Sequence, residues 1–486
     1  MKKLIALLAA MTFFAGAVSC GGRNSSSAPQ VKTEIYGTVS PPSTGSPDEE
    51  PKENITLSYA VFGRLDPEEY ELIKRFNESD NGYVIVTKDY SEIAGTDEGG
   101  NTVYDENSQL LLMITLMQDI ASGEIDIVRD YYLGSPQNMD RLAARGAFID
   151  LSQLMADDPE VSYSTLNSHV LELHESGGKL YTLPTYYTVD TLAGQSRYAG
   201  DKEGWTLDEL ISHWENMPEG ATISGHTEKY YVYFTILRSK LASYIDYENA
   251  EVHFDSPEFI KTLEFCNTFG ALSSTYSEPD PSAAQLVSEK RLVGFAEYHT
   301  ALWNEESQPV TLVGYPSDDG CGGIIDTLGN RFAISASVSD EERRGAWEFI
   351  RSYCLSDYQT SHYCKTEKMM IDGQIRETYM GAVGFPMNNA VYSQLAADAM
   401  AGKHLGSTIS ISGVEYQVGL LTQDELDRLT AYIGRIQQLS NGIDNDLSDI
   451  IQEEVSAYFS GEQTVTQCAE LIQNRASILM AEKKQT

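Results

Sequence analysis

Residues 55–87 read ITLSYAVFGRLDPEEYELIKRFNESDNGYVIVT and carry the clearest structural signal in this chain of 486 residues. Apolar and β-branched residues dominate 55–61 and 83–87, as in buried strands, whereas 67–77 has the spacing of an amphipathic helix. The order strand, helix, strand predicts a β-α-β unit with parallel strands.

The same alternation continues beyond this unit. Large apolar residues share one helical face over 110–120, the helix is expected to end at Gly123, and 125–128 predicts another short buried strand. Strands that alternate with helices predict an α/β fold with a mostly parallel, doubly wound sheet. Ligands of such sheets bind at the carboxyl ends of the strands, which indicates the loop 129–136.

Helices are also expected further along the chain. Thr206 and Glu209 form a capping box that opens one helix. The remaining helical patterns, which include a helical C-terminus, cover 259–269, 341–354, 422–436, 447–459 and 464–482.

The N-terminus has the pattern of an export signal. Two lysines precede an apolar run over 4–18, which is short for a spanning helix that needs roughly 20 residues. The sequence Ala17-Val18-Ser19-Cys20 resembles a lipobox, so residues 1–19 are expected to be removed and Cys20 to be lipidated. An ordinary cleaved signal with an incidental cysteine is the alternative.

Residues 20–54 are rich in Ser, Pro, Gly, Thr and acidic residues, with almost nothing to bury. This composition predicts a disordered tether between the lipid and a folded body that begins near residue 55.

Acidic residues outnumber basic ones by 72 to 34, which gives a net charge of −38. Nucleic-acid binding and electrostatic docking on anionic lipid both need basic surfaces and are therefore excluded. Besides Cys20 the chain has five scattered cysteines, which are expected to be small buried residues rather than a disulfide scaffold. A bridge between Cys354 and Cys364 stays open.

No motif of catalysis, metal binding or cofactor binding stands out. The sequence lacks a GxxxxGK[ST] loop, an HExxH helix and a GxSxG turn, and its eight histidines form no metal-like pair. We therefore expect no catalytic residues, no metal and no cofactor. A glycosidase stays formally open, because its two carboxylates can lie anywhere in a sequence.

Aromatic residues at connections between elements are the main candidates for ligand contacts. Aromatic rings can stack on the C–H faces of sugar rings, while hydroxyl and carboxylate groups nearby can bond sugar hydroxyls. The candidates are Tyr131, Tyr132, Tyr186, Tyr187, Tyr298 and Trp303, with the acidic residues Asp126, Asp130, Asp190 and Glu297.

Several segments together resemble the extracellular solute-binding proteins of carbohydrate ABC importers, near the maltose-binding proteins. The lipobox belongs to this set, and the other segments are 123–128 (GEIDIV), 141–151 (RLAARGAFIDL), 178–184 (GKLYTLP), 204–210 (GWTLDEL), 314–316 (GYP), 346–350 (AWEFI) and 454–482. Two departures are Arg129-Asp130, a position that is often less charged, and the long acidic connection 91–107.

The resemblance implies a periplasmic-binding-protein-like fold with two α/β lobes, each a doubly wound sheet with flanking helices, joined by a hinge. The expected lobes are 55–187 with 316–365, and 188–315 with 366–486. Tyr131 and Tyr132 would then lie on the rim of the first lobe, Tyr186 and Tyr187 near the first crossing, and Tyr298 and Trp303 on the second lobe. Trp303 is the strongest candidate, because the equivalent segment of the family commonly supplies a stacking aromatic residue.

The function that follows is capture of a sugar or oligosaccharide and its delivery to an ABC permease. The protein would be a monomer on the extracellular face of a bacterial membrane, which it contacts through its lipid anchor only. The alternatives are a surface glycosidase or esterase, a binding protein for a peptide, a polyamine or another non-sugar solute, and an adhesion lipoprotein.

Overall fold

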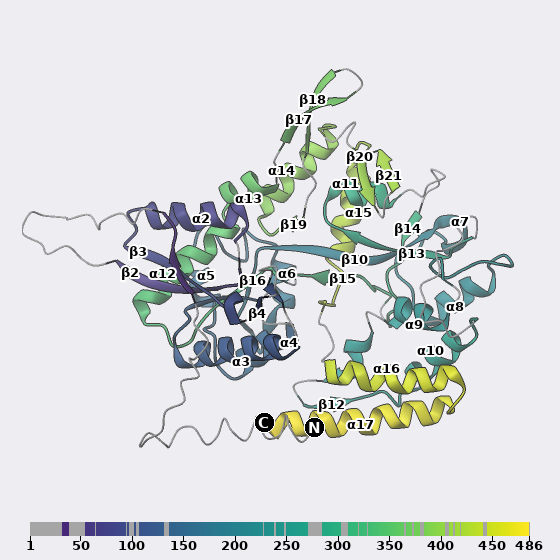
Figure 1. Cartoon of the computed structure of the whole chain (residues 1–486). Coiled ribbons are helices and arrows are strands. Elements are labelled where there is room, and N and C mark those ends of the chain that lie inside the picture. Colours follow the sequence, from purple (N-terminus) through teal and green to yellow (C-terminus); the bar gives the residue numbers. More distant parts are fainter. Residues whose placement is uncertain are drawn as a thin grey trace, which may run out of the picture.

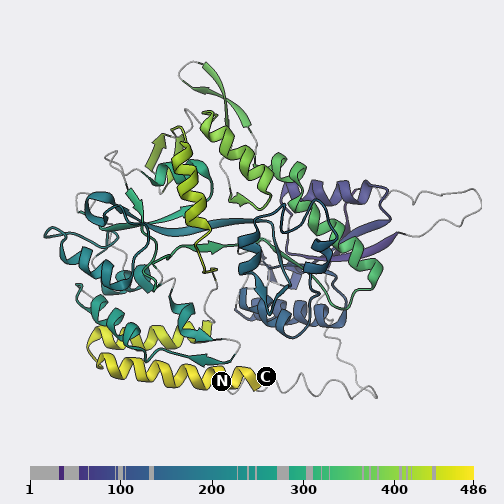
Figure 2. The same ribbon diagram turned by 180° about the vertical axis from the view of Figure 1, so that it is seen from behind.

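The computed structural model contains two β-sheets joined by strands that cross between them (Figures 1 and 2). It describes residues 32–37, 54–63, 65–93, 95–96, 102–103, 106–130, 136–226, 228–237, 240–246, 249–270, 284–302, 310–318, 320–327, 329–363, 366–371, 374–379, 383–403, 408–411, 414–417, 419–440 and 445–485.

The first sheet has six strands in the order β1-β3-β2-β6-β16-β9. The predicted β-α-β unit is confirmed: β2 and β3 pair in parallel and α2 connects them. β6 is also parallel to β2, whereas β1, β16 and β9 pair antiparallel with their neighbours. The strands are β1 (Lys32–Ile35), β2 (Ile55–Val61), β3 (Tyr83–Asp89), β6 (Ile127–Arg129), β9 (Leu183–Pro184) and β16 (Arg331–Ile334).

Strand β1 corrects part of the tether prediction. It lies inside 20–54 and pairs with β3, with Lys32 opposite Asp89 and Ile35 opposite Val86. The side chains of Thr33 and Ile35 are exposed. Backbone hydrogen bonds to β3, at the edge of the sheet, therefore order this segment. The prediction of a tether considered only whether side chains could be buried, so it did not anticipate these bonds.

Helices cover both faces of the first sheet. On one face, Leu72 and Ile73 of α2 (Pro67–Glu78) pack in one core cluster with Leu57 and Ile85. On the other face, α3 (Glu106–Ser122) and α4 (Pro136–Ala144) contribute to a separate cluster with β2 and β6. This arrangement is the doubly wound pattern that the sequence predicts.

The second sheet is built around the long strand β10 (Tyr186–Gln195), to which all its partners are antiparallel. A doubly wound sheet, with mostly parallel strands, was expected here. The strands that pair with β10 come from distant parts of the chain and run antiparallel to it. They are β13 (Val287–Leu292), β14 (Val310–Leu312), β15 (Ile324–Asp326) and β19 (Phe385–Pro386).

Within the described residues the strand pairing defines three crossings between the sheets, and the third lies between β16 and β19. β9 belongs to the first sheet and β10, two residues later, to the second; β15 belongs to the second sheet and β16 to the first. The second crossing thus lies between Asp326 and Arg331, ten residues beyond the expected lobe boundary at 315/316. The division into lobes with these limits stays a proposal.

The predicted helical C-terminus is confirmed as α15 (Gln423–Ile433), α16 (Asn445–Ser460) and α17 (Val465–Gln485). The capping box of Thr206 and Glu209 is also present, at the start of α8 (Leu207–Glu215). The other helices are α5 (Ser152–Ala156), α6 (Ser168–Leu173), α7 (Ser196–Ala199), α9 (Lys229–Leu237), α10 (Pro257–Asn267), α11 (Phe295–Ala301), α12 (Asp340–Arg351), α13 (Ser356–Tyr363) and α14 (Asn389–Met400), with short 3₁₀ turns at Ser91–Ile93, Leu241–Tyr244 and Ser352–Cys354.

Five two-stranded ribbons complete the described elements. One of them lies in the acidic segment 91–107, where a connection was expected. The ribbons are β4 (Gly95–Thr96) with β5 (Thr102–Val103), β7 (Glu175–Ser176) with β8 (Lys179–Leu180), β11 (Ile245–Asp246) with β12 (Glu251–Val252), β17 (Thr366–Ile371) with β18 (Gln374–Tyr379), and β20 (Thr408–Ile411) with β21 (Val414–Gln417).

The cysteines of the described segments have free thiols. Cys266, Cys354 and Cys468 are buried, as expected of small apolar residues, and Cys321 is half-buried. Cys20 and Cys364 lie outside the described residues. None of the helices in the described part of the chain is both long and apolar enough to traverse a membrane.

Candidate ligand-binding site

The first sheet has a switch point between β2 and β6. From β2 the chain passes through α2 to β3 on one side, and from β3 through α3 to β6 on the other side of β2. Because α2 follows β2, α4 follows β6, and these two helices cover opposite faces, the chain leaves the two strands toward opposite sides of the sheet. Open α/β sheets bind ligands in the crevice that forms at such a point.

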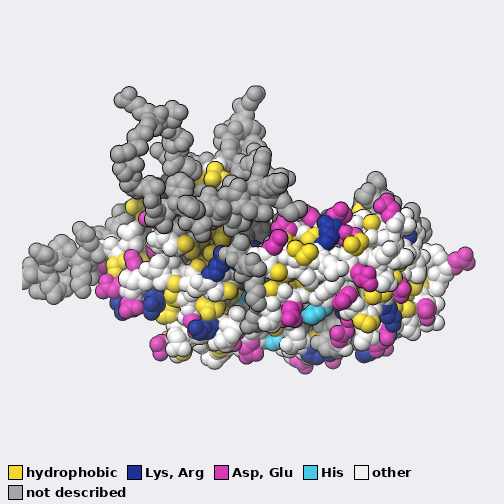
Figure 3. All heavy atoms as spheres, turned by 90° about the horizontal axis from the view of Figure 1, so that it is seen from below, with side chains coloured by type: hydrophobic (Ala, Val, Ile, Leu, Met, Phe, Trp, Pro, Cys, Tyr) yellow, Lys and Arg dark blue, Asp and Glu magenta, His cyan; other side chains and the backbone are white. Residues whose placement is uncertain are grey.

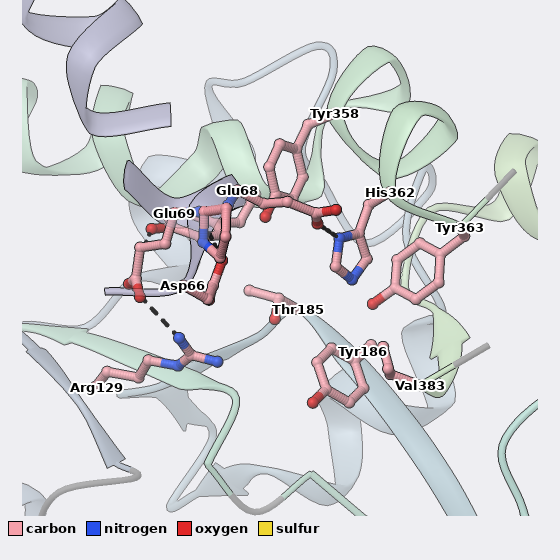
Figure 4. A pocket seen from close by; sticks show the side chains of 12 residues that line it. Asp66, Glu68, Glu69, Arg129, Thr185, Tyr186, Tyr358, His362, Tyr363 and Val383 are labelled. Atoms are coloured by element: carbon pink, nitrogen blue, oxygen red, sulfur yellow. Dashed lines mark hydrogen bonds and ion pairs between the residues drawn. The ribbon is translucent and has the colours of Figure 1, made fainter. Parts of the chain in front are cut away.

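A cavity of about 550 Å³ lies at this point (Figure 4). It is within the usual size range of small-molecule sites, about 300–1,000 Å³. Segments far apart in the sequence line it: the start of α2, the end of β6, the first crossing, and the chain around α13. The lining residues are Asp66, Pro67, Glu68, Glu69, Arg129, Thr185, Tyr186, Tyr353, Tyr358, His362, Tyr363 and Val383.

The start of α2 contributes acidic groups. Asp66 is the N-cap residue, and its Oδ1 accepts hydrogen bonds from the backbone N–H groups of Glu68 and Glu69 at 2.9 and 2.8 Å. Pro67 fits the first helical position, where no N–H is needed. The helix therefore begins at the wall of the cavity because of these residues.

Arg129 and Glu69 form the floor of the cavity. Glu69 Oε1 lies 3.5 Å from Arg129 Nη1 and accepts hydrogen bonds from the hydroxyls of Tyr59 at 2.7 Å and Tyr353 at 3.3 Å. Figure 4 shows the Arg129 side chain reaching toward Glu69 from below. These bonds hold both charged groups in fixed positions.

Aromatic side chains form the opposite wall. Tyr358 and His362 of α13 are stacked with ring centroids 5.8 Å apart, and Tyr186 meets Tyr363 edge to face at 6.2 Å. Burial raises the pKa values of Tyr186 and Tyr358, so their hydroxyl groups stay protonated and can both donate and accept hydrogen bonds. His362 Nδ1 bonds Glu68, which links this wall to α2 (Figure 4).

Of the residues predicted to bind the ligand, Tyr186 lines the cavity. It lies in β10, not in a loop as expected, and its ring packs against Gly384. Its neighbour Tyr187 points the other way, as successive strand residues do, and is fully buried. The Tyr187 hydroxyl accepts a hydrogen bond from Asn167 Nδ2 at 3.1 Å.

Three of the four predicted acidic residues are paired within the protein, and none of the four is among the residues that line the cavity. Asp126 is buried and accepts hydrogen bonds from the backbone N–H and the hydroxyl of Ser58 at 2.7 and 2.8 Å. Asp130 is buried against Arg331, and Asp190 against Arg291. Burial raises the pKa of Asp126.

Tyr298 and Glu297 lie on α11, away from the switch point. The Tyr298 hydroxyl donates to the backbone oxygen of Glu425 at 2.9 Å, and the side chain is 1 % exposed. Burial raises the pKa of Glu297. Tyr298 borders a second cavity of about 470 Å³, lined also by Ser196, Asp201, Glu203, Leu302, Val310, Thr311, Leu312, Arg428 and Arg435.

Three predicted ligand residues, Tyr131, Tyr132 and Trp303, lie outside the described residues. Within the described residues, no group of three or more His, Cys, Asp or Glu side chains is placed to hold a metal ion. Sequence reasoning did not single out Asp66, Tyr358, His362 or Tyr363. For Asp66, the Asp-Pro-Glu-Glu start of a helix next to a strand end was an available signal.

Comparison with known proteins identifies the family. A family model of bacterial extracellular solute-binding proteins matches residues 112–369, more than half of the chain. No curated protein sequence matches.

Solved structures share the fold. A family 1 extracellular solute-binding protein from Alicyclobacillus acidocaldarius is 14 % identical, with a TM-score of 0.51 over 89 % of this chain and 100 % of the other. The sugar-binding protein MalE from Xanthomonas citri is 12 % identical, with a TM-score of 0.56 over 88 % and 98 %. A periplasmic oligogalacturonide-binding protein from Yersinia enterocolitica is 13 % identical, with a TM-score of 0.53 over 88 % and 99 %.

These neighbours confirm the expected α/β fold of two-lobe binding proteins. The family and the neighbours are binding proteins, so the chain is a binding protein and not an enzyme. The family match also confirms the resemblance found in the sequence: this chain belongs to the bacterial extracellular solute-binding proteins.

Proposed function

We propose that this protein captures a carbohydrate in the cavity between β2, β6 and α13 and delivers it to an ABC permease. The observation that carries the proposal is the lining of that cavity, which has a volume of about 550 Å³ and contains both tyrosine rings and carboxylates. Flat rings suit the C–H faces of a sugar, and carboxylates and phenol groups suit its hydroxyls. Neighbours with the same fold include a sugar-binding and an oligogalacturonide-binding protein.

Capture would involve a change in the angle between the lobes. The crossings at 184–186 and 326–331 are among the connections about which the lobes would rotate, and Thr185 and Tyr186 line the cavity at the first of them. A ligand shifts the balance toward a closed form only if it contacts both lobes there. Val383 is the lining residue that belongs to the expected second lobe, and the others belong to the first.

The location follows from the first residues of the chain. The lipobox-like sequence before Cys20 supports cleavage after Ser19 and attachment of a lipid to Cys20, which would hold the protein on the extracellular face of the membrane. Acidic side chains are spread over the face seen in Figure 3, with basic ones at several places among them, and the whole chain has 72 acidic and 34 basic residues. Such a surface supports attachment through the lipid rather than through charge.

Calorimetric titration and thermal shift with mono- and oligosaccharides, amino acids and polyamines test the function, because a ligand of the native state raises the melting temperature. A sugar should bind, and Tyr358→Ala should weaken its binding at least about tenfold, since it removes one stacking face worth roughly 1.4 kcal/mol. Tyr163→Ala is the matched control, because Tyr163 is half-buried outside the cavity and bonds Glu175.

The unliganded melting temperature shows whether each variant folds. Binding of a polyamine or amino acid without any sugar would contradict the proposal. Equal loss of sugar affinity in both tyrosine variants would remove the cavity as the binding site.

A further inference from the structure

We propose, on the basis of the carbohydrate-binding function above, that the cavity accepts uncharged sugars and excludes sugars that carry a carboxylate or phosphate. The lining contains three carboxylates, from Asp66, Glu68 and Glu69, and one guanidinium, from Arg129. What decides the selectivity is that the guanidinium and the first N–H groups of α2, which would best hold an anion, already have partners within the protein.

The N-terminus of α2 would otherwise be an anion site, because the first N–H groups of a helix are unpaired and its dipole favours negative charge. In this protein the carboxylate of Asp66 occupies the anion position at the start of α2. Oδ1 of Asp66 accepts from the N–H groups of Glu68 and Glu69, its backbone oxygen accepts from the N–H of Tyr70 at 3.0 Å, and Pro67 has no N–H. No N–H of this first turn remains for a ligand.

The guanidinium of Arg129 is engaged on each of its nitrogens. Nε donates to the backbone oxygen of Gly329 at 2.7 Å and Nη2 donates to Asn330 Oδ1 at 3.0 Å. Nη1 lies 3.5 Å from Glu69 Oε1, and the guanidinium carbon lies 5.6 Å from the centre of the Phe332 ring. These contacts leave at most two of the five N–H groups of Arg129 for a ligand, and a carboxylate that bonded them would lie beside the charge of Glu69, which is only 3 % exposed.

His362 offers no fixed positive charge either. Burial lowers the pKa of His362 below the usual value of 6.5. The charge of Arg129 lowers this pKa further, and the charge of Asp66 raises it. His362 Nδ1 bonds Glu68, on the opposite wall. A sugar hydroxyl, in contrast, can donate to the carboxylates and does not add a charge beside them.

The test compares matched pairs of ligands by calorimetric titration at pH 7.5: glucose with glucuronate, galactose with galacturonate, and galactobiose with digalacturonate. The neutral member of a pair should bind at least about tenfold more tightly than the acidic member. This preference should shrink at high salt, because the carboxylates act through their charge.

Two variants separate charge from shape. Glu69→Gln can still accept from Tyr59 and Tyr353 but frees Arg129 from its ion pair, so the acidic ligand should gain about tenfold or more in affinity. Asp66→Asn keeps a good N-cap residue and removes one negative charge. It should therefore also reduce the preference for the neutral ligand over the acidic one. Glu71→Gln, at an exposed residue of the same helix that pairs with Lys74, makes an equal change in charge and should leave the preference unchanged.

Three results would overturn the inference. Tighter or equal binding of an acidic sugar by the unmodified protein would refute it while leaving carbohydrate binding intact. An equal effect of Glu71→Gln and Glu69→Gln would show that net charge, and not this cavity, sets the preference. If no sugar of either kind binds, the proposed function fails and the inference fails with it.

Discussion

Arg331 on β16 and Asp130, the residue after β6, form a buried ion pair with Nε and Oδ2 2.7 Å apart. The two residues are 2 % and 6 % exposed, and the backbone N–H of Arg331 donates to Asp130 Oδ1 at 3.0 Å. The pair joins the second crossing to the end of β6, next to the candidate site. Asp130, a ligand candidate by sequence, is thereby engaged with the strand that enters from the second sheet.

Asp130→Ala should therefore lower the free energy of unfolding by about 3–5 kcal/mol, because it leaves a buried guanidinium without its main partner. Chemical denaturation measures the change. Glu453→Ala, which breaks a surface ion pair with Arg475, should cost less than about 1 kcal/mol. A comparable small loss in Asp130→Ala would mean that Asp140, 3.3 Å from Arg331, is a sufficient partner.

His174 should make the stability depend on pH. Burial, with a smaller effect of Arg331, lowers its pKa well below 6.5, and its Nε2 lies 2.9 Å from Thr327 Oγ1. The folded state keeps this ring neutral while the unfolded chain takes up a proton below pH 6.5. The contribution is thus fully present above pH 6.5 and is lost as the pH falls, by up to about 1.4 kcal/mol per pH unit.

Denaturation curves between pH 7.5 and 5 test this expectation. His174→Gln should lose less stability over this range than the unmodified protein, since no proton is taken up at that position. His253→Gln, at an exposed residue, should keep the original slope. Parallel curves for all three proteins would refute the assignment to His174.

Local patterns were sufficient to predict the β-α-β unit, the capping box and the C-terminal helices, because each depends on residues close in sequence. The antiparallel pairing of β10 with β13, and the strand β1 at the edge of the sheet, depend on partners that are distant in sequence. Tyr186 and Tyr187 looked like loop residues after Pro184, yet they begin β10.

The candidate site was harder to predict for the same reason. Asp126 meets Ser58 across 68 positions and Asp130 meets Arg331 across 201, and nothing local signals these partners. An acidic residue at the end of a strand therefore looks like a ligand group when it is a buried structural one. Tyr358 and His362 reach the cavity from almost 300 positions beyond Asp66, so only the folded chain brings them together.

Cys20→Ser should release the protein from the membrane. The substitution removes the thiol that a diacylglycerol would modify, while the folded part of the chain is untouched. Detergent phase partitioning and intact-mass measurement of the protein expressed in bacteria check this. Cys321→Ser, at a half-buried thiol, should leave the protein in the detergent phase. Partitioning of the Cys20 variant into detergent would contradict lipidation.

Trp303→Ala should weaken sugar binding and leave the melting temperature of the unliganded protein nearly unchanged. The expectation rests on the family resemblance, in which the equivalent segment supplies a stacking ring worth roughly 1 kcal/mol or more. Calorimetric titration gives the affinity. Trp214→Ala, which removes a ring packed at 4.9 Å against Phe269, should instead lower the melting temperature and spare affinity. Unchanged sugar affinity in Trp303→Ala would exclude the residue from the site.

Gly204→Ala should be among the most damaging small substitutions in the second lobe. Gly204 has a φ of 84°, and a Cβ atom built on it would lie 1.3 Å from the backbone oxygen of Gly320. That atom belongs to a rigid backbone, so one of the two loops must move. The loops are also joined directly, since Ser317 N–H donates to the oxygen of Trp205 at 2.8 Å.

Gly220→Ala separates the two causes of damage. Gly220 has a similar φ of 80° but no atom within 4 Å of its Cβ position, so alanine there should cost only the left-handed conformation, about 1–2 kcal/mol. Gly204→Ala adds the collision with Gly320 to the same conformational cost, and should therefore lose clearly more stability in urea than Gly220→Ala does. Equal losses would mean that the loop of Gly320 yields freely, and that the contact between the two loops does not hold this part of the second lobe together.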